Sequence, residues 1–302
     1  MAILSSIRQI LVLFKLRIGV AMAMTAGAGI VAMPGPAPSA GQTTLLILAV
    51  LLSAGAAGGL NHYHDYDIDR LMDRTRNRPF VTGVLRRSPL WLVFFALLLL
   101  VPVALVWRYI NPVAAIHVFM GAFFYGVVYT VWLKRRTWLN IVIGGLAGSF
   151  AILSGTAILH PQPTPLALSL AFILFLWTPP HFWSLAIALK KDYQDAGIPM
   201  LPVVAGEARA ARTVFFNTVL LALASLLPLL FGMGWIYLVG ALMGSAVFLV
   251  KSWLLVRNPT SDQAMSSFRA SLIQLALFLT ALYIEGGFFH ASPANGVLVA
   301  LL

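Results

Sequence analysis

The sequence predicts an all-α membrane protein in which about nine transmembrane helices form one bundle. Sixty per cent of its residues are hydrophobic, only 10% are charged and the mean hydropathy is +0.91, far from the balance of a soluble domain. Apolar runs of about 20 residues, the length needed to cross a bilayer, recur along the chain. The sequence shows no strand-length alternation of apolar and polar residues. Because no water in the hydrocarbon core can bond to backbone groups, an α-helical bundle is the economical arrangement.

The apolar runs are separated by turn-forming residues, with proline-rich or glycine-rich breaks at 160–165, 232–234 and 258–261. We treat residues 1–302 as a single membrane-embedded domain. The nine expected spans are residues 17–35, 43–61, 89–110, 112–132, 139–160, 164–188, 213–232, 234–256 and 269–289.

The first residues carry Arg8, Lys15 and Arg17 but no small-residue cleavage site, which indicates a retained cytoplasmic amphipathic segment and not a signal peptide. With the amino terminus inside, 19 of the 20 lysines and arginines fall on the cytoplasmic side and only Arg108 falls outside. The net charge of +11 is therefore mainly a topology signal, and nucleic-acid binding explains it poorly. The chain has no cysteine, which excludes disulfides, thiolate metal ligands and cysteine nucleophiles.

The acidic residues do not follow from topology. Seven of the nine lie in two loops that the predicted topology places on one face of the membrane. We expect the two loops to form one polar mouth over an apolar cavity, suited to a ligand that is part charged and part hydrocarbon. The seven are Asp65, Asp67, Asp69 and Asp73 after the second span, and Asp192, Asp195 and Glu207 after the sixth.

Spacing sharpens the prediction for the first loop. If the second helix continues past the membrane edge, Asn61, Asp65, Asp69 and Asp73 recur every four residues and share one face, whereas Asp67 points elsewhere. Like charges at that spacing destabilise a helix, and a hard cation with oxygen ligands relieves the repulsion. Mg²⁺ suits a sparse amide and carboxylate site because it takes few protein ligands together with phosphate oxygens.

Four arginines follow at once, Arg70, Arg74, Arg76 and Arg78. Guanidinium groups donate bidentate hydrogen bonds to phosphate, so the segment predicts a metal and diphosphate site. The alternative is a solvated loop in which the arginines obey the topology rule and the aspartates neutralise them.

Four sequence blocks carry a family resemblance. They are NHYHDYDIDRLMDRTRNRP at 61–79, YTVWLKR at 129–135 with NIVIGG at 140–145, WTPPHFW at 177–183, and DYQDAGIPMLP at 192–202. In this order and spacing they resemble the intramembrane prenyltransferase (UbiA) superfamily, and within it the members that farnesylate haem, over about residues 10–290. Two features depart from the family pattern: LAGSFAILSG replaces a proline pair after Gly145, and His62 and His64 lie inside the first block.

The resemblance implies a Mg²⁺-dependent enzyme that transfers a farnesyl group from farnesyl diphosphate to a vinyl group of haem B, with addition of water, to make haem O. It implies a bacterial inner (plasma) membrane location with the active site facing the cytoplasm. Haem A synthase or terminal oxidase assembly factors would be further partners.

The resemblance also assigns roles to residues. Asn61, Asp65 and Asp69 would hold one Mg²⁺ and Asp192 would help hold a second. Arg74, Arg78 and Lys134 would bind diphosphate, and Asp65, Asp69, Asp192 and Lys134 form the expected catalytic set. The expected contacts to the prenyl chain and the acceptor are Tyr129, Trp177, His181, Phe182 and Trp183.

Several alternatives stay open at this point. Lys134 belongs to a basic triplet that topology alone would place, and His181 follows two prolines, where it could satisfy freed backbone groups. The same machinery would also serve a quinone precursor or another ring acceptor. A transporter is a third possibility, disfavoured because its polar residues would be expected near the bilayer midplane, whereas here they gather at one edge.

Overall fold

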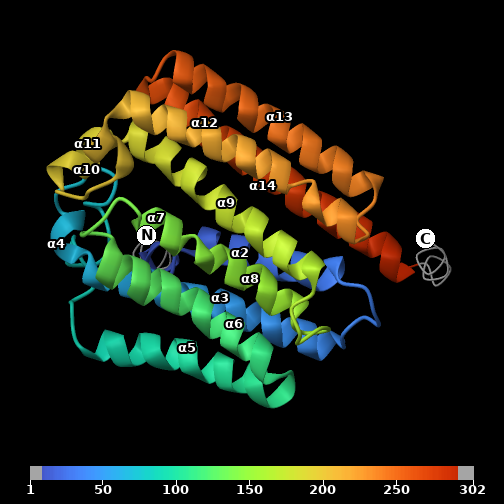
Figure 1. Ribbon diagram of the computed structural model, residues 1–302. Helices are drawn as coiled ribbons and strands as arrows, with labels where there is room; N and C mark the ends of the chain where they lie inside the picture. The colour runs from blue at the N-terminus through green and yellow to red at the C-terminus, as the bar shows by residue number, and fades with distance from the viewer. Residues whose placement is uncertain (1–8, 292–302) are drawn as a thin grey trace, which may run out of the picture.

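The fold is a bundle of helices, as the hydropathy predicts. The computed structural model describes residues 9–291, so Arg8 and the tail after Pro293 lie outside the described residues. Between residues 9 and 291 the regular structure is helical and no β-strand occurs. Figure 1 shows the long helices side by side, with the short helices α4, α10 and α11 together at one end of the bundle.

Seven helices among the described residues are long and apolar enough to span a membrane. Each coincides with a predicted span, which confirms the fold class. They are α3 (Ala40–His64), α5 (Leu90–Tyr109), α6 (Pro112–Phe123) continued by η1 (Phe124–Leu133), α9 (Pro165–Ala188), α12 (Glu207–Ala224) continued by η2 (Leu227–Phe231), α13 (Trp235–Arg257) and α14 (Ser261–Ala291).

The other two predicted spans correspond to shorter apolar helices. The first is α2 (Leu16–Ala32), with 17 residues, and the second is α7 (Asn140–Gly144) followed by α8 (Leu146–Thr156). Seventeen residues rise only about 25 Å, less than the ~30 Å hydrocarbon thickness of a typical bilayer. The count of nine therefore stays a prediction.

The two acidic segments meet at one end of the bundle. Helix α4 (Tyr66–Asp69) follows α3, while α10 (Lys190–Asp195) and α11 (Leu201–Ala205) follow α9. Ile68 and Met72 from the first segment share a buried apolar cluster with Tyr193 and Ile198 from the second. Apolar packing beneath the charged residues thus brings the two loops together, as their common face predicts.

Helices α2 and α8 approach each other closely through glycine. A methyl group added to Gly155 would overlap the carbonyl oxygen of Ala26, and one added to Gly29 would overlap that of Ile152. Small residues allow such backbone contact between membrane helices. In a bilayer the hydrophobic effect does not drive helices together, so close packing and its dispersion energy hold them. This contact holds α2 and α8 together in their carboxyl-terminal halves.

The second half of the α6 span is a π-helix, which the sequence pattern does not predict. In η1 the amide of Lys134 donates to the carbonyl of Tyr129, five residues earlier, at 2.9 Å. Nine residues of an α-helix, at 3.6 per turn, make about two and a half turns and would put Tyr125 and Lys134 on opposite faces. The wider π turn lets both side chains line the same cavity.

Gly155→Ala should destabilise the protein, because the added methyl group meets backbone and not a flexible side chain. The expected cost is about 1–3 kcal/mol, the usual range for overpacking a core. Gly148→Ala in the same helix is the matched control, since the atom nearest to its new methyl group lies at 4.0 Å. Thermal unfolding in detergent should separate the two variants, and equal melting temperatures would contradict the close contact.

Candidate active site

Asn61, Asp65 and Asp69 lie on one buried face, as their four-residue spacing predicts. Helix α3 ends at His64, Asp65 sits at the break, and α4 continues the chain to Asp69. The three residues are 1%, 0% and 1% exposed, whereas the side chain of Asp67 is 61% exposed. Two carboxylates are thus held inside an apolar bundle, where each needs a positive partner.

The prediction that Asp73 shares this face is wrong. Helix α4 ends at Asp69, so the helical spacing does not continue to residue 73. The Asp73 side chain is 79% exposed and pairs with Arg76 at 3.1 Å. It belongs to the surface loop and does not reach the buried pair.

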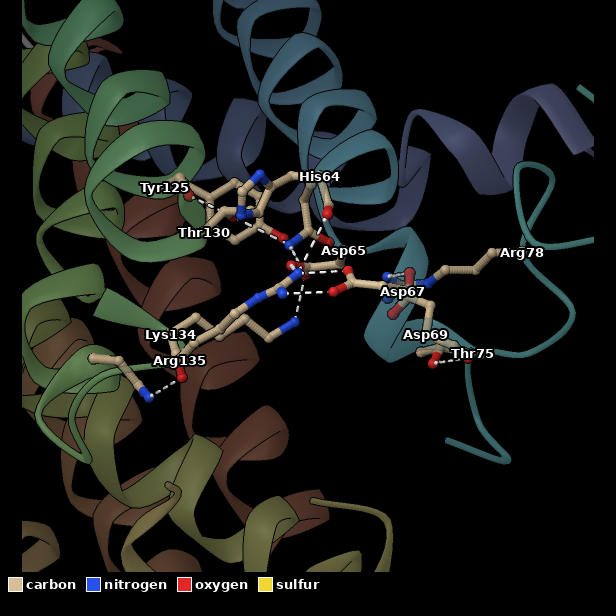
Figure 2. A network of polar contacts seen from close by, with 12 residues as sticks. His64, Asp65, Asp67, Asp69, Thr75, Arg78, Tyr125, Thr130, Lys134 and Arg135 are labelled. Carbon is tan, nitrogen blue, oxygen red and sulfur yellow. Dashed lines mark hydrogen bonds and ion pairs between the residues drawn. The ribbon is translucent and has the colours of Figure 1, made fainter. Parts of the chain in front are cut away.

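Asp65 is held by residues from two helices. Its Oδ2 atom pairs with the Lys134 ammonium and accepts a hydrogen bond from Asn61 Nδ2 at 2.7 Å. The same amide group donates to Thr130 Oγ1 at 3.1 Å, which ties the end of α3 to η1 (Figure 2). Lys134 is only 7% exposed, so topology alone does not explain it.

Asp69 is held by the loop that follows it. Arg78 Nη1 pairs with Asp69 Oδ2 at 2.5 Å, and the Thr75 hydroxyl donates to the Asp69 carbonyl at 3.1 Å. Burial raises the pKa of Asp69, and the Arg78 guanidinium opposes that rise. The chain folds back so that its own arginine neutralises the carboxylate.

An exposed ion pair covers this buried network. Arg135 donates to both carboxylate oxygens of Asp67 at 2.6 Å, and these hydrogen bonds are the main reason why the pKa of Asp67 falls to about 2. Arg135 Nη2 also lies 3.9 Å from Asp65 Oδ1, too far for a hydrogen bond. Consecutive residues of the basic triplet therefore serve the buried and the exposed aspartate.

A cavity opens beside Asp69, which lines its wall, and extends into the bundle, whereas Asp65 is not among the lining residues. The cavity encloses about 1600 Å³ not occupied by protein atoms, including its open end. Most of the cavity wall away from its polar end is formed by apolar side chains and small residues of α2, α3, α6, α8 and α9. The polar end is lined by Lys15, Asn61, Asp69, Arg74, Arg78 and Lys134.

Lys15 and Tyr125 also belong to this site, although neither lies in a motif that predicts a site residue. Lys15 Nζ donates at 2.6 Å to both Asn61 Oδ1 and Tyr125 Oη. Lys15 has a left-handed backbone, with φ of 47°, which is uncommon for any residue other than glycine. Burial, with help from Arg78 and Lys134, lowers the pKa of Lys15 well below its usual value. A lone lysine just before an apolar helix was the only sequence signal.

A hydrogen bond joins the second acidic segment to the first, above the apolar cluster that the two segments share. Asp192 Oδ2 accepts a hydrogen bond from the Arg74 amide at 3.4 Å, while the neighbouring Tyr193 is buried and lines the cavity. Asp192 therefore lies at the polar end of the cavity, beside the arginine loop (residues 70–78, which carry four arginines).

The aromatic block of α9 divides into two groups. Trp177 and Phe182 line the cavity, as does Tyr129 from η1, whereas His181 and Trp183 are not among the lining residues. His181 Nδ1 is 2.6 Å from Ser271 Oγ, and its ring stacks at 4.2 Å on Trp177. The structure thus ties His181 to α14, and its contact with haem stays a prediction.

Comparison with known proteins identifies the family. The model of the UbiA prenyltransferase family matches residues 21–282. The chain belongs to the UbiA prenyltransferase family. A protoheme IX farnesyltransferase 2 from Paramagnetospirillum magneticum is 54% identical over 93% of this chain and 98% of its own length. A protoheme IX farnesyltransferase 1 from the same organism is 46% identical over 80% of this chain and 85% of its own length.

Solved structures of UbiA proteins share the fold. A UbiA homologue from Archaeoglobus fulgidus bound to DMAPP and Mg²⁺ superimposes with a TM-score of 0.67 at 16% identity, covering 91% of this chain and 99% of that one. A digeranylgeranylglyceryl phosphate synthase gives a TM-score of 0.76 at 19% identity, covering 93% and 99%. At these identities the likeness shows the fold, and the site must be judged on its own residues.

The carboxylates of this UbiA site fit a hard cation. The Oδ1 atoms of Asp65 and Asp69 are buried and have no hydrogen-bond partner among the described residues. No cluster of three or more histidine, cysteine, aspartate or glutamate side chains exists in the described part of the chain. A cation here would rely on two carboxylate oxygens and on oxygens of its substrate, which is how Mg²⁺ commonly binds. Asn61 is less available, because Lys15 occupies its side-chain oxygen.

Lys15→Met should weaken the binding of inorganic pyrophosphate with Mg²⁺ by about tenfold, because it removes a cation that lines the polar end of the cavity. Arg17→Met, an exposed position two residues away, is the control and should bind normally. Titration calorimetry on the purified protein measures both. Equal affinities for the two variants would remove Lys15 from the site.

Proposed function

We propose that this UbiA-family protein transfers a farnesyl group from farnesyl diphosphate to a vinyl group of haem B to make haem O. The observation that carries the proposal is a cation-lined mouth around Asp65 and Asp69 at the end of an apolar cavity. A diphosphate needs the first feature and an isoprenoid chain needs the second. The 54% identity to a protoheme IX farnesyltransferase supports the choice of donor and acceptor.

The donor binds with its diphosphate at the polar end. Lys15, Arg74, Arg78 and Lys134 supply positive charge to the diphosphate oxygens. Asp65 and Asp69 would hold one Mg²⁺, and Asp192, beside Arg74, would help to hold a second. Bound Mg²⁺ would neutralise charge on the leaving diphosphate. These fixed cations favour the transition state because negative charge grows on the diphosphate as the allylic bond to oxygen breaks.

Lys15 has a second part in this proposal. Its ammonium occupies the Asn61 side-chain oxygen, and a diphosphate offers it a more strongly charged acceptor. When Lys15 turns toward the diphosphate, the Asn61 oxygen becomes free to serve as a ligand. Donor binding would in this way complete the oxygen set that the four-residue spacing predicts.

The reaction balances without an oxidant. Diphosphate leaves with the electron pair of the carbon–oxygen bond, and the allylic carbon bonds to the terminal carbon of the haem vinyl group. Water adds to the resulting cation and loses a proton, giving the hydroxyethylfarnesyl side chain.

Tyr125 and Tyr129 stack at 5.7 Å and line the cavity near the cationic end. Their ring faces can stabilise a passing cation.

A quinone precursor or another ring acceptor is the second candidate. One observation favours it: His181 and Trp183 of the aromatic block are not among the residues that line the cavity. The block therefore offers no imidazole in the cavity wall to contact haem. A transporter is less consistent with the site, because the charged groups gather at one end of the cavity and not at its middle.

The proposed activity is tested by incubating the purified protein with haem B, farnesyl diphosphate and Mg²⁺ and weighing the extracted haems by mass spectrometry. We expect a product with the mass of haem O. Asp65→Asn and Asp69→Asn should each lower its formation at least about a hundredfold, in line with the loss of a group that stabilises transition-state charge. A chelator should stop the reaction.

Asp73→Asn is the matched control, because this aspartate is exposed and outside the buried network. It should keep normal activity. Unchanged product in the Asp65 or Asp69 variants would contradict the metal assignment, whereas prenylation of a ring compound other than haem B would favour the second candidate.

We also propose that the polar mouth faces the cytoplasm, as the distribution of basic residues predicts. The cysteine-free chain allows a direct test with single exposed cysteines. Val84→Cys and Gln194→Cys should be labelled by a membrane-impermeant maleimide only from the cytoplasmic side, and Arg108→Cys only from outside. Labelling of Val84→Cys and Gln194→Cys from opposite sides would rule out a shared mouth.

A further inference from the structure

The apolar cavity ends at a definite level inside the bundle. Its deepest lining residues on four helices are Thr25 of α2, Val50 of α3, His117 of α6 and Ser154 of α8. Just beyond this level, Gly155 brings the backbone of α8 against Ala26 of α2. Glycine-mediated backbone contact closes the bundle there, so the cavity is a slot with a floor on this side.

The depth of the slot can be counted along its helices. Ten residues separate Lys15 from Thr25 on α2, and eleven separate Val50 from Asn61 on α3. At 1.5 Å per residue these intervals correspond to about 15–17 Å between the cationic end and the floor. This depth is comparable with an extended chain of three isoprene units.

The His117 ring is fixed at the floor by packing. It lies 5.9 Å from the Phe150 ring, tilted by 31°. Its buried Nδ1 atom has no hydrogen-bond partner among the described residues. The two hydroxyls among the deepest lining residues are already bonded within their own helices, Thr25 to the Ala21 carbonyl at 2.9 Å and Ser154 to that of Ala151 at 2.7 Å. The ring therefore contributes volume to the floor, and its Nδ1 atom is not held by a hydrogen bond to any described residue.

We propose that the His117 ring sets the length of prenyl chain that the slot accepts, so that a three-isoprene donor fits and a four-isoprene donor does not. This inference rests on the proposed prenyl-transfer function. A hydrocarbon tail anchored by its diphosphate at Lys134 and Arg78 reaches the floor with its last unit. A further isoprene unit, about as large as the imidazole ring, has no space unless that ring is removed.

Ligation of haem iron by His117 does not satisfy the same geometry. The reacting carbon of the donor stays next to the diphosphate, about 15 Å from the floor by helical rise. A macrocycle with its iron on His117 could not bring a vinyl group that far. The free imidazole nitrogen is thus a feature of the floor and not of an acceptor site.

The test measures binding and turnover of geranyl, farnesyl and geranylgeranyl diphosphates by the purified full-length protein with Mg²⁺. The wild type should prefer farnesyl diphosphate. His117→Ala should raise the preference for geranylgeranyl over farnesyl diphosphate by about tenfold or more, the discrimination expected from space in an apolar pocket. His117→Phe keeps a ring at the floor, somewhat larger than imidazole, and should still exclude geranylgeranyl diphosphate.

A larger ring gives a test in the opposite direction, independent of whether the alanine variant folds. His117→Trp should shift the preference toward geranyl diphosphate. His160→Ala is the control, since His160 bonds to the Pro34 carbonyl in a loop and does not line the slot. An unchanged length preference in His117→Trp, or equal changes in His117→Ala and His117→Phe, would overturn the proposal. Failure of the wild type to bind any prenyl diphosphate would instead reject the proposed function.

Discussion

The structure depends on the pairing of two carboxylates that are buried in an apolar bundle. Taking an ion out of water costs several kcal/mol, which an opposite charge offsets only when it is held in good geometry. Asp65 and Asp69 obtain that charge from Lys134 and Arg78, which lie on other segments of the chain. The mouth can therefore form only when α3, α4, η1 and the arginine loop are all in place. The charges that assemble the mouth are the same charges that a diphosphate and its metal would use.

The membrane spans and the buried acidic face could be predicted from the sequence, because each depends only on residues that are close together along the chain. Each span must satisfy its own backbone inside the hydrocarbon, so hydropathy located the seven long helices. Four-residue spacing located the buried face of Asn61, Asp65 and Asp69. The error at Asp73 came from extending the helix beyond Asp69, where no hydropathy signal marks its end. The short helices α2 and α7–α8 show a second limit of the sequence-based prediction, because the composition of an apolar run does not show where its helix ends.

The rest of the site depends on contacts between residues distant in sequence. Lys15 meets Asn61 and Tyr125 across 46 and 110 residues, and neither distance leaves a trace in local pattern. The aromatic block of α9 shows the opposite case, because a motif with clear spacing divides into cavity-lining and buried members. His181 is engaged by Ser271, 90 residues later. Spacing thus identified which segments matter, while packing decided which side chains face the ligand.

The π-helix η1 has a consequence for how this segment can vary. Its wider turns place Tyr125, Tyr129 and Lys134 along one wall of the cavity. Removing a single residue would return the segment to the ordinary α-helical hydrogen-bond pattern, with little change in its length or hydropathy. Lys134 would then rotate away from Asp65 and leave that carboxylate buried without its cation. The segment should therefore accept substitutions at positions that do not line the cavity but no insertion or deletion, so its length is the property under strictest constraint.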